Sequence, residues 1–241
     1  MNSNHTIKAI FFDLDGTLRH SVPEGGQVAT EYVISLGLSV SDEDRLRAAR
    51  WEYLYWANSA DLRDDLIAHS ADTDMFWIEY SRRRLVAVGA SPAWASEHAA
   101  DISAHMGEMY KPDSIVPEDV QRALPELKEA GYYMAVISNR EKPFLDVMES
   151  HKLSPFFEFS LAAGEVDSYK PDPGVFEHAL KRANLTASEV VYVGDNYFAD
   201  IVGSRRAGLH PVLFDPDSIF PEADCTVITS FDQLKSVIEA I

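Results

Sequence analysis

The sequence has little cysteine, few basic residues for its acidity and no long apolar run, and each absence excludes a class of protein. The single Cys225 has no internal disulfide partner and belongs to no Cys/His metal pattern, so we interpret it as a small buried hydrophobe. Lys and Arg total 21 against 39 Asp and Glu, and the formal charge of -18 repels nucleic acid. No run approaches the ~18 apolar residues of a membrane span. The sequence therefore predicts neither a nucleic-acid partner nor a membrane partner.

The residues before Ile7 are polar and show no apolar stretch followed by a small-residue cleavage site. They do not resemble a signal peptide, so a cytoplasmic location is expected. A chain of 241 residues, of which 46% are hydrophobic, can bury one α/β core and still form a smaller second domain.

Strands alternate with helical patterns in the C-terminal half of the chain. A buried, β-prone strand is predicted at residues 7–12, and further strands follow near residues 132–137, 157–162, 190–193, 211–214 and 226–228. Helical spacing of apolar residues separates these strands. The pattern predicts an α/β fold, with a Rossmann-like parallel sheet and helices on both of its faces.

Only helical signals occur between about residues 26 and 110. Helix starts are indicated at Ser41, at Asp72 or Thr73, and at Ser91-Pro92. We therefore predict an all-helical cap domain at residues 21–112, inserted into a catalytic core made of residues 1–20 and 113–241.

This insertion also holds all four tryptophans and the basic run Arg82-Arg83-Arg84. We interpret most of the tryptophans as its own core, although the stretch from Trp51 to Trp56 could line a substrate pocket. Three consecutive helical residues point in different directions, so we interpret the arginines as a solvated face.

Short polar motifs follow several predicted strands. They are Asp13-Leu14-Asp15-Gly16-Thr17, Ser138-Asn139, Lys170-Pro171, and Gly194-Asp195-Asn196 with Asp200. Each alone is compatible with an ordinary turn, loop or helix cap. Their order matters more, because the carboxyl ends of parallel strands meet at the edge where open α/β sheets bind ligands.

In this order the motifs resemble those of the haloacid dehalogenase superfamily, in the branch that carries a helical cap after the first strand. The resemblance covers nearly the whole chain. It implies that Asp13 is a nucleophile that forms an aspartyl-phosphate. It also implies that Asp15 protonates the leaving alcohol and then deprotonates the attacking water. These two roles require that the surroundings of Asp15 raise its pKa.

The resemblance further implies a Mg²⁺ site formed by Asp13, Asp195 and the backbone carbonyl of Asp15, with Asp200 or Asn196 orienting these ligands. Lys170 and Ser138 join Asp13 and Asp15 as catalytic residues. The implied phosphate-binding set, acting through the Ser138 hydroxyl, the Lys170 charge and backbone amides, is Leu14, Gly16, Thr17, Ser138, Asn139 and Lys170. Thr17 is also expected to position Asp15 or its loop.

The chain departs from the family pattern after Leu18. Many relatives carry an acidic residue two positions after this leucine, where His20 stands here. Arg19 and His20 could touch the substrate, but we interpret them as exposed loop residues.

The predicted function is a Mg²⁺-dependent phosphatase acting on a small phosphorylated metabolite. A phosphomutase is an alternative, because the same motifs serve both chemistries. A dehalogenase is less compatible with the sequence. Dehalogenation needs no acid for the leaving group, and the dehalogenases of this superfamily look to lack the second aspartate, which is present here as Asp15. A non-catalytic relative would be expected to have lost one of Asp13, Asp15, Lys170 or Asp195. The sequence carries no readable signal for the physiological substrate or the oligomeric state.

Overall fold

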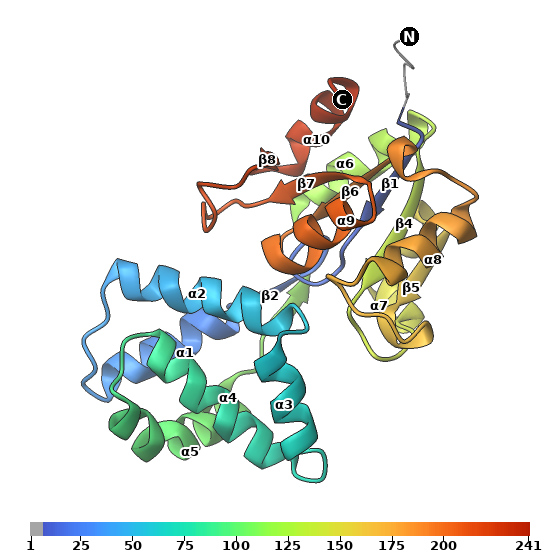
Figure 1. The fold of residues 1–241 in the computed structure, drawn as a ribbon. Coiled ribbons are helices and arrows are strands. Elements are labelled where there is room, and N and C mark those ends of the chain that lie inside the picture. Colours follow the sequence, from blue (N-terminus) through green and yellow to red (C-terminus); the bar gives the residue numbers. More distant parts are fainter. Residues whose placement is uncertain (1–6) are drawn as a thin grey trace. The chain divides into compact units, whose positions relative to one another are not determined.

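A computed structural model describes residues 7–241 of the chain. The expectation about a signal peptide concerns residues outside this range. The described chain divides into two compact units, one made of the segment up to His20 together with Ile115–Ile241, and one made of Ser21–Ser114 (Figure 1). The segments that connect the units pair as two short strands, β2 (His20–Val22) and β3 (Asp113–Ile115).

The first unit contains a six-stranded sheet in the order β5-β4-β1-β6-β7-β8. Every neighbouring pair in it is parallel. Its strands are β1 (Ala9–Phe12), β4 (Tyr133–Ser138), β5 (Phe159–Ala162), β6 (Val190–Gly194), β7 (His210–Phe214) and β8 (Thr226–Ile228). The predicted parallel α/β fold is confirmed. The chain builds outward from β1 first on one side and then on the other, so β1 lies at the topological switch point where such sheets bind ligands.

Helices cover both faces of this sheet because its central strand is apolar on both. Ile10 and Phe12 of β1 belong to the core beneath α6 (Glu118–Glu129), α7 (Leu145–Ser150) and α10 (Leu234–Glu239). Ala9 and Phe11 belong to the core beneath α8 (Pro173–Ala183) on the opposite face. Short 3₁₀ turns complete the connections at Ser154–Phe156, Ala163–Glu165, Ala187–Glu189 and Phe231–Gln233.

One regular helix was predicted after β6, but the structure has two different helical segments there. The segment Tyr197–Ile201 forms a wider π-helical turn, and only then does α9 (Val202–Arg206) begin. Asn196 caps the turn, since its Oδ1 accepts from the backbone N–H groups of Phe198 and Ala199. Asp200 accepts in turn from the N–H of Asn196 at 2.9 Å. This capped turn fixes the position of Asp200.

The second unit is helical, with α1 (Gly25–Ser35), α2 (Asp42–Trp56), α3 (Ala60–Ala68), α4 (Thr73–Ala87) and α5 (Pro92–Met109). The predicted helix starts are confirmed: Ser41, Asp72 and Ser91 each accept a hydrogen bond from a first-turn N–H of their helix. None of the helices in the described part of the chain has the length and apolar character needed to cross a membrane.

Three interpretations of single side chains need correction. Arg84 is buried, because its guanidinium pairs with Glu52 and donates to the carbonyl oxygen of Gly26 and the hydroxyl of Thr30. Two of the four tryptophans, Trp56 and Trp77, are substantially exposed, since they line a cavity within the second unit instead of filling its core. Cys225 is only partly buried.

Leu124→Ala is expected to lower the free energy of unfolding by about 2–5 kcal/mol, because it leaves a cavity between α6 and the sheet. Leu124 is 1% exposed, whereas Leu145 on α7 is 61% exposed. Leu145→Ala is therefore the matched control and should change the free energy by at most about 0.5 kcal/mol. Urea titrations followed by circular dichroism measure both values. Equal losses in the two variants would contradict this packing.

Candidate active site

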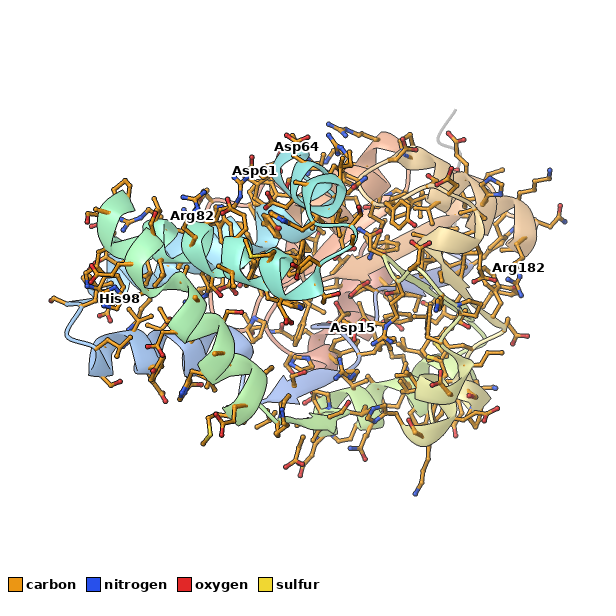
Figure 2. The ribbon with its side chains drawn as sticks, turned by 90° about the horizontal axis from the view of Figure 1, so that it is seen from below. Asp15, Asp61, Asp64, Arg82, His98 and Arg182 are labelled. Atoms are coloured by element: carbon orange, nitrogen blue, oxygen red, sulfur yellow. The ribbon has the colours of Figure 1, made fainter. Side chains whose placement is uncertain are left out.

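The sequence motifs of the first unit converge at the carboxyl end of the central strands. Asp13 directly follows β1 and donates its N–H to the Val193 carbonyl of β6 at 2.9 Å. Ser138 closes β4 on the other side of β1 and is buried. Asp195 follows the last residue of β6. Asp15 lies in the loop after β1 (Figure 2). The parallel register therefore brings these motifs to one edge of the sheet.

Lys170 is the centre of the buried part of the site. Its Nζ lies 2.5 Å from Oδ1 of Asp13, 2.6 Å from Oδ1 of Asp200 and 3.0 Å from the hydroxyl of Tyr192. Asn139 holds the Lys170 backbone, accepting from its N–H at 2.7 Å and donating to its carbonyl at 2.9 Å. The side chain of Asn139 thus positions Lys170.

A cluster of three carboxylates surrounds this lysine. Asp13, Asp195 and Asp200 each offer one oxygen, and these atoms all lie within 4.8 Å of one another. Burial raises the pKa of Asp13 to about 7, even though the Lys170 charge opposes the shift. Burial and the charges of Asp13 and Asp200 raise the pKa of Asp195 well above its ordinary value. A single lysine leaves negative charge uncompensated here. The all-oxygen donor set suits a hard divalent cation, so the cluster could hold a metal ion.

The loop after β1 is shaped to admit Asp195. Gly16 has a φ of +91°, and a Cβ built on it would lie 2.2 Å from Oδ2 of Asp195. Thr17 donates through Oγ1 to Oδ1 of Asp195 at 2.8 Å and accepts from the Asp195 N–H at 3.0 Å. Thr17 was expected to position Asp15 or its loop, and because its hydroxyl is committed to Asp195, it is the loop that Thr17 positions. The buried side chains of Leu14 and Leu18 anchor the loop.

Asp15 lies in a different electrostatic environment from Asp13. Arg140 donates through Nε to Oδ2 at 2.8 Å and through Nη2 to Oδ1 at 2.9 Å, and Arg19 donates through Nη1 to Oδ1 at 2.6 Å. Burial alone would raise the pKa of Asp15, but the two guanidinium groups outweigh burial and lower it. The expectation that the pKa of Asp15 is raised is therefore wrong.

Several residues of this arrangement were missed or underestimated from the sequence. The signal for Arg140 was its place directly after Ser138-Asn139. Arg19 was interpreted as an exposed loop residue, yet its side chain is 20% exposed and paired with Asp15. Tyr192 lies within an apolar strand, so no sequence signal indicated that its hydroxyl contacts Lys170. Asp200 was expected only to orient the metal ligands, and it also pairs with Lys170.

A family model described as haloacid dehalogenase-like hydrolase matches residues 7–208. The chain belongs to the haloacid dehalogenase-like hydrolase family. This confirms the resemblance inferred from the motifs.

Two relatives cover most of this hydrolase. A protein of Vibrio cholerae named phosphoglycolate phosphatase is 28% identical over 210 residues, spanning 85% of this chain and 83% of the relative. A protein of Halopiger xanaduensis named ribulose-1,5-bisphosphate 5-phosphatase is 32% identical over 225 residues, spanning 90% of this chain and 87% of the relative. The expected enzyme class, a phosphoric monoester hydrolase, is the class of these relatives.

A solved structure with the same architecture is a 2-haloacid dehalogenase from Pseudomonas syringae pv. Tomato. It has a TM-score of 0.57 and 25% sequence identity, and the match covers 98% of this chain and 99% of the dehalogenase. The family's fold thus extends over the whole described chain.

Asp195→Asn is expected to stabilise the protein in the presence of a metal chelator, and more at about pH 8 than at about pH 5. Because the folded-state pKa of Asp195 is raised, folding takes up a proton between the unfolded and folded pKa values, so stability falls as pH rises through that interval. The amide keeps an oxygen acceptor for Thr17 and carries no charge. Urea titrations at both pH values measure the effect.

The matched control is Asp217→Asn, at an exposed position of the same unit. It should leave the stability difference between the two pH values unchanged. A loss of stability in Asp195→Asn at both pH values would contradict the electrostatic interpretation.

Proposed function

We propose that this hydrolase is a Mg²⁺-dependent phosphatase that acts on a small phosphomonoester through an aspartyl-phosphate on Asp13. The observation that carries the proposal is the buried contact of Asp13 with Lys170, beside the carboxylates of Asp195 and Asp200. An anionic nucleophile next to a fixed cation and a cation-binding cluster is what attack on a phosphate ester requires.

Asp13 attacks phosphorus, the bond to the ester oxygen breaks, and the leaving oxygen takes a proton from Asp15. Water then attacks the aspartyl-phosphate while Asp15 accepts its proton, which returns Asp13 and releases phosphate. The arginine contacts favour the ionised form of Asp15, which suits the second step. Donation in the first step requires that these contacts loosen.

Lys170 would offset the negative charge of Asp13 and of the phosphoryl oxygens. The Ser138 hydroxyl and the amides of Leu14, Thr17 and Asn139 would donate to those oxygens. The amide of Gly16, also expected to bind phosphate, donates instead to the Arg19 carbonyl at 2.8 Å. Mg²⁺, held by the carboxylates of Asp13 and Asp195 and the carbonyl of Asp15, would supply further neutralisation of phosphate charge. Asp200, fixed by its capped turn and by Lys170, would keep the cluster in place.

The helical unit Ser21–Ser114 would act as a cap that excludes water and selects the leaving group, with β2 and β3 as its connecting strands. A capped site favours small phosphorylated metabolites over macromolecules. The cytoplasmic location expected from the sequence stays a prediction.

The names of the relatives supply the first substrates to test. They are 2-phosphoglycolate and ribulose 1,5-bisphosphate, to which an aryl phosphate is added as a generic ester. Asp13→Asn is expected to lower Mg²⁺-dependent phosphate release by at least ~10³-fold, because the amide cannot act as the nucleophile. A colorimetric phosphate assay with and without Mg²⁺ measures this, with Asp217→Asn as the control for a carboxylate outside the site.

Each other outcome points to a named alternative. Release that survives in Asp13→Asn would rule out this nucleophile. Phosphoryl transfer that depends on a bisphosphate activator, with little phosphate released, would indicate a phosphomutase. Chloride release from a 2-haloacid would indicate the activity named for the Pseudomonas syringae structure.

Asp15→Asn tests the acid–base role through the leaving group. The variant is expected to lose about 10²–10⁴-fold in kcat on an alkyl phosphate, whose alkoxide must be protonated as it departs. The loss in the phosphorylation step should be much smaller on 4-nitrophenyl phosphate, since nitrophenolate leaves without a proton. Burst-phase measurement of nitrophenolate release isolates that step. Equal losses on both esters would show that Asp15 does not protonate the leaving group.

A further inference from the structure

Two arginines from separate parts of the first unit meet at Asp15. Arg140 follows the end of β4 and makes a two-pronged contact with both carboxylate oxygens, at 2.8 and 2.9 Å. Arg19 comes from the loop after β1, and its Nη1 lies 2.6 Å from Oδ1. One partly exposed carboxylate thus faces two guanidinium groups that reach it from different elements.

The first unit positions the Arg140 guanidinium and the backbone of Arg19. The Arg140 guanidinium lies 5.8 Å from the ring centroid of the buried Phe144. The backbone of Arg19 is tied into the turn, because its N–H donates to Leu14 and its carbonyl accepts from Gly16. The planar fork of a guanidinium group loses little entropy for each hydrogen bond that it forms with a carboxylate or a phosphate.

We propose that Arg140 and Arg19 form a second anion-binding subsite, and that the preferred substrates are phosphomonoesters whose leaving group carries its own carboxylate or phosphate. This inference rests on the proposed function, in which Asp15 faces the leaving oxygen. A charge recognised beside Asp15 must then belong to the alcohol part of the ester, at a distance of a few bonds from the leaving oxygen.

The subsite is open to an incoming anion. The side chains of Asp15, Arg140 and Arg19 are 36%, 33% and 20% exposed, so the ion pair can exchange partners without opening the buried core. A carboxylate or phosphate of the substrate offers the acceptor geometry that Asp15 now provides to Arg140. Exchange of partners would also turn the Asp15 oxygens toward the leaving group.

The test compares esters that differ only in the second charge. 2-Phosphoglycolate is paired with ethyl phosphate, and 1,3-propanediol bisphosphate with propyl phosphate, so that the two pairs separate a carboxylate from a phosphate as the recognised group. The measured quantity is the ratio of kcat/KM within each pair. The wild-type ratio should exceed about tenfold in at least one pair, as expected for a hydrogen-bonded charge.

Arg140→Gln and Arg19→Gln should each reduce that ratio by about tenfold or more, because each removes one guanidinium from the subsite. Arg140→Lys should restore part of it, since the charge returns without the two-pronged geometry. Arg122→Gln is the matched control: Arg122 makes a similar two-pronged contact with Asp232, neither residue belongs to a motif, and the substitution should leave the ratio unchanged.

A wild-type ratio near one in both pairs would overturn the subsite. So would an equal loss of kcat/KM for both members of a pair in the arginine variants, because the arginines would then only position Asp15.

Binding of phosphonates separates failure of the subsite from failure of the proposed function. By calorimetry, 3-phosphonopropionate should bind at least about tenfold more tightly than propylphosphonate, and Arg140→Gln should abolish this preference. If no ester were hydrolysed but this preference held, the subsite would stand and the phosphatase proposal would fail. If hydrolysis occurred and the phosphonates bound equally, the subsite would be overturned while the phosphatase proposal stood.

Discussion

The ion-pair network around Lys170 is the constraint on which the rest of the site depends. Its ammonium group is buried with Asp13, Asp200 and the Tyr192 hydroxyl, so each of its N–H donors has a partner. Buried charges are tolerated only when they are paired and hydrogen-bonded. The end of β1, the strand β6, the π-helical turn and the loop that holds Lys170 must therefore keep their mutual positions, and the parallel sheet supplies the rigid base that makes this possible.

The charges of this network nevertheless do not balance. Three clustered carboxylates face one lysine, and burial raises the pKa of both Asp13 and Asp195. Such a cluster costs stability unless another cation or a proton joins it. The close approach of Gly16 and the two hydrogen bonds between Thr17 and Asp195, one donated and one accepted by the Thr17 hydroxyl, hold Asp195 against this repulsion. Local destabilisation of this kind is common at functional sites, where the stability of the surrounding fold offsets it.

Two aspartates two residues apart acquire opposite electrostatic characters. Asp13 points into the buried network, where desolvation raises its pKa, whereas Asp15 lies at a more open position where arginines lower its pKa. Separation of carboxylates by environment is how one site assigns them different roles. In the proposed mechanism it distinguishes a nucleophile from an acid–base group, and it places the arginines on the side of the leaving alcohol.

The sequence alone determined what local patterns encode. Apolar runs predicted the buried strands, and Ser41, Asp72 and Ser91 predicted helix starts, because period and capping are properties of neighbouring residues. The ordered motifs predicted the family, because their order along the chain can be read without knowing which residues meet in space. Tertiary structure alone decided the contact between Thr17 and Asp195 across 178 positions, the convergence of Arg19 and Arg140 on Asp15, and the burial of Arg84. Each of these depends on which elements the fold brings together, and a charged side chain carries the same local pattern whether it ends in solvent or against a distant partner.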